Sequence, residues 1–441
     1  MGGTIKVGVA WSFASTSVGA VTHLVYLYVL ATLGGPEVVG LYSLLAAFQS
    51  IAYALQDGGL LTYYIHRQNL TPEEQSALFW LAVLAGIVAA SALLAAAPIL
   101  ARIYDAPELR IPLALISTQI LILAFSSQCQ AHLMKQLRLG RLAKIEILGK
   151  TISLAALLAL YLCEPESSKL LVCVFGSILM GGLVRSTGLM FSCASLPAQA
   201  FSVRPDWAIT KPAIRYTSYH LGAQLINQFR ANVDVFILAK LLGAELTGVY
   251  AVAKEAVLKP SRVIQPVIAR VLTPAFARTQ GGSGKQGLLY LRSLNLCSLA
   301  NGVVFAGLAI AGPWVVVALL GESYFMSGVM VALLSVWGFC RSLGSPSASL
   351  AYANGRSEID FYWNTMVLPI TVLVITAGAI SSDLIVLALM LVIFQVLVAF
   401  STYFVFVRRL LEDITFLEFL SQWWKPFIIV VACAALSYFM L

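Results

Sequence analysis

Long apolar runs follow one another along almost the whole chain, separated by short polar connections. A run of about 20 such residues is enough for an α-helix to cross the hydrocarbon core of a bilayer. Backbone polar groups in lipid have to be satisfied within the segment, which makes helices the expected structure of these runs. The expected spans are 10–33, 38–62, 77–100, 110–132, 142–163 and 169–194 in the first half, and 213–241, 246–276, 288–318, 325–352, 359–380 and 383–407 in the second.

Composition supports the same fold class. Apolar residues make up 60% of the chain and charged residues only 11%, with a mean hydropathy of +0.88. A soluble domain has about 25% charged residues. A last apolar piece, 426–441, is short for a full span. The prediction is therefore an all-α polytopic membrane protein with about 12 to 14 transmembrane helices.

One short sequence occurs twice. The stretch Leu30 to Tyr42, LATLGGPEVVGLY, recurs as Leu238 to Tyr250, LAKLLGAELTGVY, with Leu, Ala, Leu, Gly, Glu, Gly and Tyr at matching positions. Each copy lies where one expected span ends and the next begins. Because six spans separate the two copies, both lie on the same side of the membrane, as in parallel repeats. We predict two pseudo-symmetric six-helix lobes.

The expected domain boundaries follow from the polar connection rich in Pro and charge in the middle of the chain. We predict a first lobe over 1–196, a cytoplasmic linker over 197–212, and a second lobe over 213–408. The remainder, 409–441, is expected to hold an interfacial helix that ends in a Trp pair, followed by the apolar C-terminal piece. This tail is either a plain connector or a docking site for a polysaccharide polymerase or glycosyltransferase.

The Lys and Arg residues in loops indicate orientation. They gather on the side of the N-terminus, for example at Arg138, Arg141 and Lys144. Cytoplasmic loops carry such an excess, so the N-terminus is expected inside the cell. This placement accounts for most of the +8 formal charge, and no nucleic-acid partner is predicted. The seven cysteines show no metal-binding spacing, and GGSGKQG at 281–287 lacks the complete pattern of a P-loop, so neither a cofactor, a metal nor ATP is predicted.

Ionisable residues inside spans are expensive and are rare without a function. They concentrate on the first two helices of the second half, where positions three or four apart form polar stripes. The substrate-binding candidates there are His220, Gln224, Asn227, Arg230, Lys254, Lys259 and Arg262. Pairing of Arg230 with Asp234 and of Glu255 with Lys259 would be the structural alternative. Arg262 then has no carboxylate left nearby in sequence, which makes it the strongest candidate for a phosphate contact.

The first half has a milder polar stripe that is neutral and aromatic. Its substrate-binding candidates are His23, Tyr26, Gln49 and Tyr53. Uncharged hydrogen-bonding groups and Tyr rings suit sugars, while the cations of the second half suit phosphate. The two stripes together predict a cavity for a lipid-linked sugar. Coupling to an ion gradient would use carboxylates, with Asp57, Asp234 and Glu255 as candidates, and coupling to the membrane potential is the alternative.

The sequence also resembles a known family. The runs GPEVVGLYSLLAAFQSIAYALQDGGLLTYYIHRQNL and APILARIYDAPELRIPL in the first half, and NVDVFILAKLLGAELTGVYAVAKEAVLKPSRVIQPVIARVLTPAFARTQ in the second, are similar to polysaccharide exporters of the Wzx type. These belong to one superfamily with MATE drug antiporters and lipid II flippases. The resemblance implies a flippase without catalytic activity. It would carry undecaprenyl-diphosphate-linked oligosaccharide repeat units across the bacterial inner membrane by alternating access.

Two other classes stay open at this point. A MATE-like multidrug antiporter would share the two lobes, but should present acidic and aromatic residues to cationic drugs. A membrane polymerase or ligase acting on lipid-linked sugars would carry a sizeable catalytic loop outside the membrane, and no expected outside loop is long enough.

Overall fold

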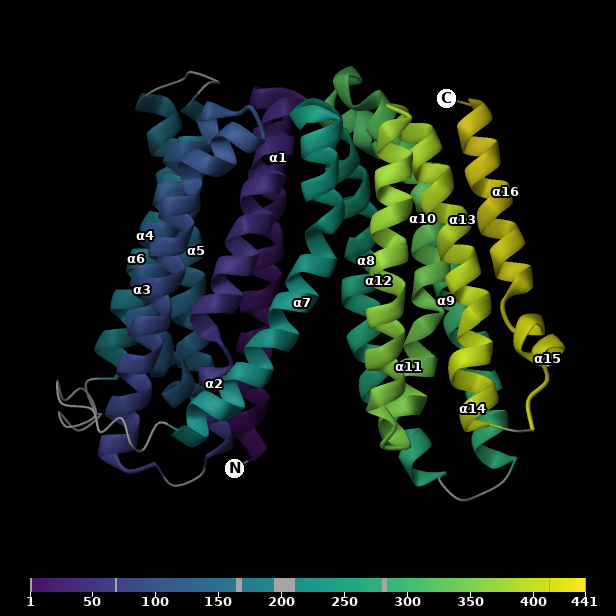
Figure 1. Ribbon diagram of the computed structural model, residues 1–441, viewed down its shortest axis with the longest axis horizontal. Coiled ribbons are helices and arrows are strands. Elements are labelled where there is room, and N and C mark those ends of the chain that lie inside the picture. The colour runs from purple at the N-terminus through teal and green to yellow at the C-terminus, as the bar shows by residue number, and fades with distance from the viewer. Residues whose placement is uncertain are drawn as a thin grey trace. The chain divides into compact units, whose positions relative to one another are not determined.

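The computed structural model describes residues 2–67, 70–163, 169–193, 211–279, 284–411 and 413–440, and every element within these ranges is helical (Figure 1). The first half contains α1 (Gly2–Asp57), α2 (Leu60–His66), α3 (Pro72–Ile103), η1 (Pro107–Leu109), α4 (Arg110–Lys135), α5 (Leu139–Cys163) and α6 (Leu170–Ser192). The second half contains α7 (Lys211–Leu241), α8 (Gly243–Arg278), α9 (Lys285–Leu320), η5 (Glu322–Tyr324), α10 (Phe325–Ser342), α11 (Gly344–Ala353), α12 (Ser357–Ile380), α13 (Leu384–Thr402), η6 (Tyr403–Val407), α14 (Arg408–Leu410), α15 (Phe416–Ser421) and α16 (Trp424–Met440).

By its internal contacts the chain divides into two compact units, Met1–Phe236 and Ile237–Leu441. In the first, α3 packs on α4, α5 packs on α6, and α1 contacts all four. In the second, α10 is central and packs on α8, α9, α13 and α16. The division falls inside α7, whereas the sequence places the lobe boundary at the linker over 197–212. That boundary stays a prediction.

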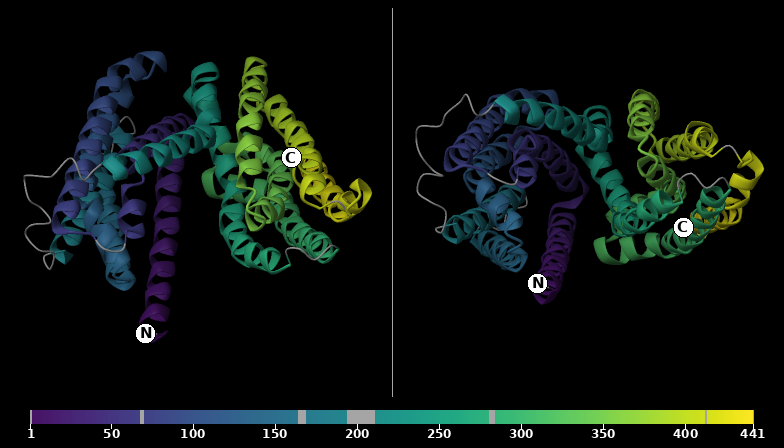
Figure 2. Two further views of the ribbon diagram at one scale, coloured as in Figure 1. Left: turned by 60° about the horizontal axis from the view of Figure 1, so that its bottom comes forward. Right: turned by 90° about the horizontal axis from the view of Figure 1, so that it is seen from below.

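The two copies of the repeated sequence adopt the same local structure. α1 changes direction at Gly35, which has φ 73° and ψ −174°, so its two parts are the two separate spans expected there; the change of direction is visible in Figure 2. The matching Gly243, at the start of α8, has φ 82°. A side chain disfavours this left-handed region, and glycine adopts it at little cost. The flanking residues match in burial as well, since Leu30 and Leu238 are both buried, and so are Tyr42 and Tyr250.

A second pair of corners extends the correspondence between the halves. Pro98 lies inside α3 near its end, and Pro313 lies inside α9 near its end. Each helix is followed by a single 3₁₀ turn, η1 or η5, and then directly by α4 or α10. The buried residue that closes each turn is Leu109 in one half and Tyr324 in the other. The halves therefore share an order of helices and turns, as the repeated sequence predicts.

Among the described residues, nine helical stretches are long and apolar enough to cross a membrane. One of them, Ala10–Ile65, contains both parts of α1 and so covers two expected spans. α7 and α8 are not among the nine, although 31 and 36 residues would make helices of about 46 and 54 Å. Their polar stripes lower their hydropathy. The structure confirms the all-α polytopic class.

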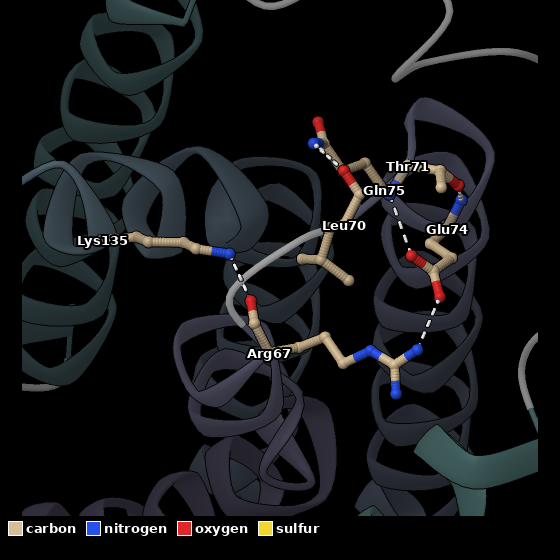
Figure 3. A network of polar contacts seen from close by, with 6 residues as sticks. All are labelled: Arg67, Leu70, Thr71, Glu74, Gln75 and Lys135. Carbon is tan, nitrogen blue, oxygen red and sulfur yellow. Dashed lines mark hydrogen bonds and ion pairs between the residues drawn. The ribbon is translucent and has the colours of Figure 1, made fainter.

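A polar network joins the ends of α2, α3 and α4 (Figure 3). Thr71 and Glu74 form a capping box at the start of α3, in which each side chain accepts a hydrogen bond from the other residue's backbone N–H. Glu74 also accepts a hydrogen bond from Arg67 at 3.2 Å. Lys135, at the end of α4, donates to the backbone oxygens of Arg67 and Tyr64. The network holds the connection between α2 and α3 in place, and the charged group of Lys135 has a structural role in it.

The segment after α13 differs from the single interfacial helix expected from sequence. It consists of the π-helical η6, the short α14 and α15, and Leu411, directly after α14, has an extended conformation. Aromatic rings hold it together, with Trp423 packed against Phe400, Phe419 and Phe427. α16 has 17 residues and packs on α9 and α10. Ring contacts also join the two sides of the break, with Tyr403 packed against Phe416 and Phe419.

Candidate functional site

A cavity of about 420 Å³ lies within the first unit, among helices α1, α4, α5 and α6 of Figure 1. Its volume falls at the small end of the range of about 300–1,000 Å³ that is usual for ligand pockets. Both parts of α1 contribute to its wall, with Tyr26 from the first part and Tyr53 from the second. The lining residues are Thr22, Tyr26, Tyr53, Gln119, Leu123, Glu146, Gly149, Lys150, Ser153, Ile178, Gly181, Gly182 and Arg185.

Three ionisable side chains face one another across this cavity. Glu146 and Lys150 lie one turn apart on α5, and Arg185 comes from α6. The Nη2 atom of Arg185 is 3.9 Å from a carboxylate oxygen of Glu146, and these side chains are 22% and 26% exposed. All three residues lie within spans, where charge is costly unless it is paired or serves a function. One carboxylate against two cations leaves the group with a net charge of +1.

Neutral partners hold the three groups in place. Ser15 donates a hydrogen bond of 2.6 Å to Glu146 through its hydroxyl. Lys150 donates one of 2.8 Å to the backbone oxygen of Ser15. Arg185 donates to the Oε1 atom of Gln130 at 2.7 Å. Helices α1, α4, α5 and α6 are thus linked through the charged group, and a hydrogen bond to an ion is stronger than a neutral one.

The aromatic and amide side chains of the cavity form a second polar network. The Tyr26 hydroxyl lies 2.5 Å from Ser153 Oγ and 3.0 Å from Ser177 Oγ. Gln49 donates to the Tyr53 hydroxyl at 2.8 Å and to Gln119 at 3.0 Å. The interior of this lobe is therefore lined with hydrogen-bonding groups of the kind that bind sugar hydroxyls.

Small residues let α5 and α6 approach closely beside the cavity. A Cβ atom built on Gly181 would lie 2.5 Å from the backbone oxygen of Gly149 and 2.7 Å from the Cβ of Ser153. One built on Gly149 would lie 2.9 Å from the backbone oxygen of Gly181. Such small-residue contacts are a common way for helices to pack in membranes. They place Lys150 and Arg185 on neighbouring walls of one cavity.

The neutral, aromatic stripe expected on the first two spans of this half forms only part of the cavity wall. The cavity contains the expected Tyr26 and Tyr53, with Gln49 bound to Tyr53, but it also contains Lys150, Arg185 and Glu146. Glu146 was not a candidate from sequence. The spacing could have identified it, because Glu146 lies four residues before Lys150 on one expected span, and such a spacing places two side chains on one face of a helix.

On α8 the pairing also differs from the expected one. Glu255 accepts two hydrogen bonds from Arg262, at 3.1 and 2.9 Å, in a bidentate pair. Spacing in the sequence favours Lys259 as the partner of Glu255 and leaves Arg262 without a carboxylate. The observed pair shows that this expectation is wrong. The Arg262 side chain is nevertheless 59% exposed. Lys254 and Lys259 are half-buried on the same helix.

The α7 candidates differ in environment. Asp234 is buried, whereas Asn227 is exposed. His220, Gln224 and Arg230 are half-buried, and the His220 ring lies so close to Gly59 that a Cβ there would be 2.4 Å from it.

Two candidates on α1 have structural contacts. The Asp57 carboxylate accepts hydrogen bonds from the backbone N–H groups of Gly59 and Leu61, at the start of α2. The His23 ring packs edge-on against Tyr42, with 6.5 Å between ring centroids. Both contacts show how these polar groups are accommodated in a span.

The fold is one that solved structures of membrane transporters share. The chain is similar over 98% of its length, and 97% of the other, to the structure of the lipid II flippase MurJ in an inward closed conformation, with a TM-score of 0.66 and 11% sequence identity. It is also similar to an inward-facing multidrug resistance MATE family transporter of the MOP superfamily, with a TM-score of 0.62 and 14% identity over 99% and 97% of the two chains. At these identities the likeness concerns the fold alone.

The family follows from sequence. Residues 29–327 match the family model described as polysaccharide biosynthesis protein, and the chain belongs to this family. It is 32% identical to the amylovoran biosynthesis protein AmsL of Erwinia amylovora, over 85% of this chain and 95% of that protein. It is 25% identical to the lipopolysaccharide biosynthesis protein WzxC of Escherichia coli K12, over 98% and 86%. It is 26% identical to the teichuronic acid biosynthesis protein TuaB of Bacillus subtilis 168, over 88% and 78%.

Proposed function

We propose that this protein is a flippase that moves undecaprenyl-diphosphate-linked oligosaccharide repeat units across the bacterial inner membrane, for the assembly of a surface polysaccharide. The observation that carries the proposal is a polar, charged cavity inside an apolar helical lobe of a chain that belongs to the polysaccharide biosynthesis family. The fold it shares with a protein named as a lipid II flippase supports a lipid-linked substrate. The bundle supplies polar groups for a sugar head group within the membrane, which is what such a substrate requires.

The mechanism we propose is alternating access, with the N-terminus in the cytoplasm. The sugar head group enters a polar interior while the polyprenyl tail stays in lipid, and the two lobes open in turn to either side. No covalent bond is made or broken, so the protein is a transporter and not an enzyme. An ion gradient or the membrane potential would drive the cycle, and Asp57, Asp234 and Glu255 are the carboxylates proposed for ion coupling.

The second-half cations keep their proposed role in holding the diphosphate. Arg262 already presents two donors to Glu255, and a guanidinium has five in a fixed fork. Its exposed part supplies donors for a second anion, with Lys259 and Lys254 on the same helix. Their proposed companions on α7 are His220, Gln224, Asn227 and Arg230.

The test measures lipid-linked oligosaccharides in cells that lack the gene, with spheroplasts used to assign them to a leaflet. We expect complete repeat units to accumulate on the cytoplasmic leaflet. The wild-type gene should relieve the accumulation, and Arg262→Ala should not. The matched control is Arg356→Ala, since Arg356 is also an exposed arginine paired with a glutamate, Glu358, but lies at the start of α12, outside the two helices that carry the proposed phosphate contacts. A normal distribution between the leaflets in the deletion strain would refute the proposal.

A further inference from the structure

We infer that the cavity of the first lobe is a binding site for a sugar that carries a single carboxylate, and that Glu146 sets this preference by balancing one of the two cations, Lys150 and Arg185. The inference rests on the proposed function, because it names the class of sugar that the flippase accepts. It concerns a site inside one lobe and is independent of the phosphate contacts proposed on α8.

The size of the cavity restricts the ligand to part of a glycan. Its volume of about 420 Å³ holds one or two sugar rings and not a whole repeat unit with its lipid. Gly149, Gly181 and Gly182 form a wall without side chains, while Tyr26 and Tyr53 supply rings and hydroxyls. Such a compact space, with a few hydrogen-bonding groups in an otherwise apolar wall, is typical of ligand pockets.

Charge determines which sugar fits best. Lys150 and Arg185 with Glu146 leave a net charge of +1 within membrane spans, where an unbalanced charge is unfavourable. A bound carboxylate cancels it. A neutral sugar leaves +1 in place, and a phosphate monoester, with a charge near −2 at neutral pH, converts it to about −1. The monoanion is therefore the ligand that the site neutralises.

The cations have donors to give to such a ligand. Lys150 has three N–H donors, and the structure records one hydrogen bond from Nζ, to Ser15. Arg185 uses Nη2 toward Gln130, while its contact to Glu146 at 3.9 Å is longer than a hydrogen bond. Glu146 is held mainly by Ser15 and so stays in place as a fixed counter-charge. The carboxylate of a sugar can thus bind both cations while Glu146 keeps its own partner.

The experiment measures binding of three probes to the purified full-length protein by calorimetry or saturation-transfer NMR: glucuronate, glucose and glucose 1-phosphate. We expect glucuronate to bind about tenfold or more tightly than the other two, a difference of about 1.4 kcal/mol. Lys150→Gln and Arg185→Gln should remove this advantage. Lys144→Gln, on the same helix but against the ring of Trp11, should keep it.

The decisive variant is Glu146→Gln, which raises the net charge of the cavity to +2. It should shift the preference toward glucose 1-phosphate by about tenfold. Glu146→Asp retains the charge and should retain the preference for glucuronate. This control distinguishes the effect of the lost charge from an effect of the substitution on folding. Equal binding of glucuronate and glucose by the wild type, or an unchanged preference in a folded Glu146→Gln variant, would overturn the inference.

The leaflet assay and the binding assay fail independently. If repeat units are distributed normally between the leaflets in the deletion strain while the purified protein still prefers glucuronate, the proposed function is refuted and the carboxylate site stands. If flipping is lost in the deletion strain but the purified protein shows no preference for the carboxylate, the inference falls alone.

Discussion

Gly35 and Gly243, at matching positions of the repeated sequence, both have a left-handed backbone, with φ values of 73° and 82°. Neither would bring an added Cβ within 4 Å of another atom. The requirement for glycine is therefore one of backbone conformation and not of space. The sequence repeat marks a structural repeat in which each copy ends one long helix and starts the next.

Replacing either glycine by alanine should destabilise the protein by about 1–3 kcal/mol, the cost of holding a residue with a side chain in such a positive-φ conformation. The measurement is the apparent melting temperature in detergent, followed by size-exclusion chromatography. Gly222→Ala is the control, because Gly222 also has open space around it but lies inside α7 without a positive φ. A lower melting temperature for Gly222→Ala than for Gly35→Ala would contradict this account.

Sequence alone predicted the helices and their corners well, because each rests on local properties. A run of apolar residues specifies a span whatever its neighbours are. The corner at Gly35 was visible as an interruption between two runs that recurs at Gly243. The broken helix after α13 was not predicted, since it depends on rings that come from separate elements, such as Phe400 and Trp423.

The candidate site was predicted less completely. Spacing identified Tyr26 and Tyr53 as polar positions of one lobe, and both line the cavity. Spacing failed where the partner of a charged residue is determined by the length of its side chain or by the packing of two helices. Arg262 pairs with Glu255 two turns away on α8, a separation that its long side chain can bridge. Arg185 and Glu146 meet only because α5 and α6 approach closely at Gly149 and Gly181, which no pattern of spacing reports.

Removing the carboxylate of Glu146 should cost stability as well as selectivity. Glu146→Gln leaves Arg185 and Lys150 without a counter-charge inside a span, and we expect a loss of about 1–3 kcal/mol. The double variant Glu146→Gln with Arg185→Gln should recover part of this loss, because it returns the net charge of the cavity from +2 to the wild-type value of +1. The melting temperatures of the single and double variants measure the coupling. Additive effects of the two changes would show that the residues do not interact.

The close contact of α5 and α6 gives a sharper packing test. Gly181→Ala places a methyl group against the backbone oxygen of Gly149, which cannot move without shifting the helix. A loss of about 1–3 kcal/mol is expected for such overpacking. Gly176→Ala, on the same helix, meets only the end of the Leu160 side chain at 3.4 Å and should be tolerated. Similar melting temperatures for the two variants would contradict the proposed packing.

Acid should loosen α15 through Glu418, which lies outside the spans. Hydrogen bonds from the backbone N–H and the hydroxyl of Thr415 hold the pKa of Glu418 below its usual range. A carboxylate with a lowered pKa stabilises the fold above its ordinary value of about 4.3, and this contribution disappears as the pH falls through the lower folded value. Hydrogen exchange of Phe416–Ser421, corrected for its intrinsic pH dependence, should therefore rise on acidification.

Glu418→Gln should show the faster exchange already at pH near 7, whereas Asp413→Asn, an exposed acid close by, should match the wild type. Equal exchange in the two variants at neutral pH would mean that the carboxylate of Glu418 does not hold this helix.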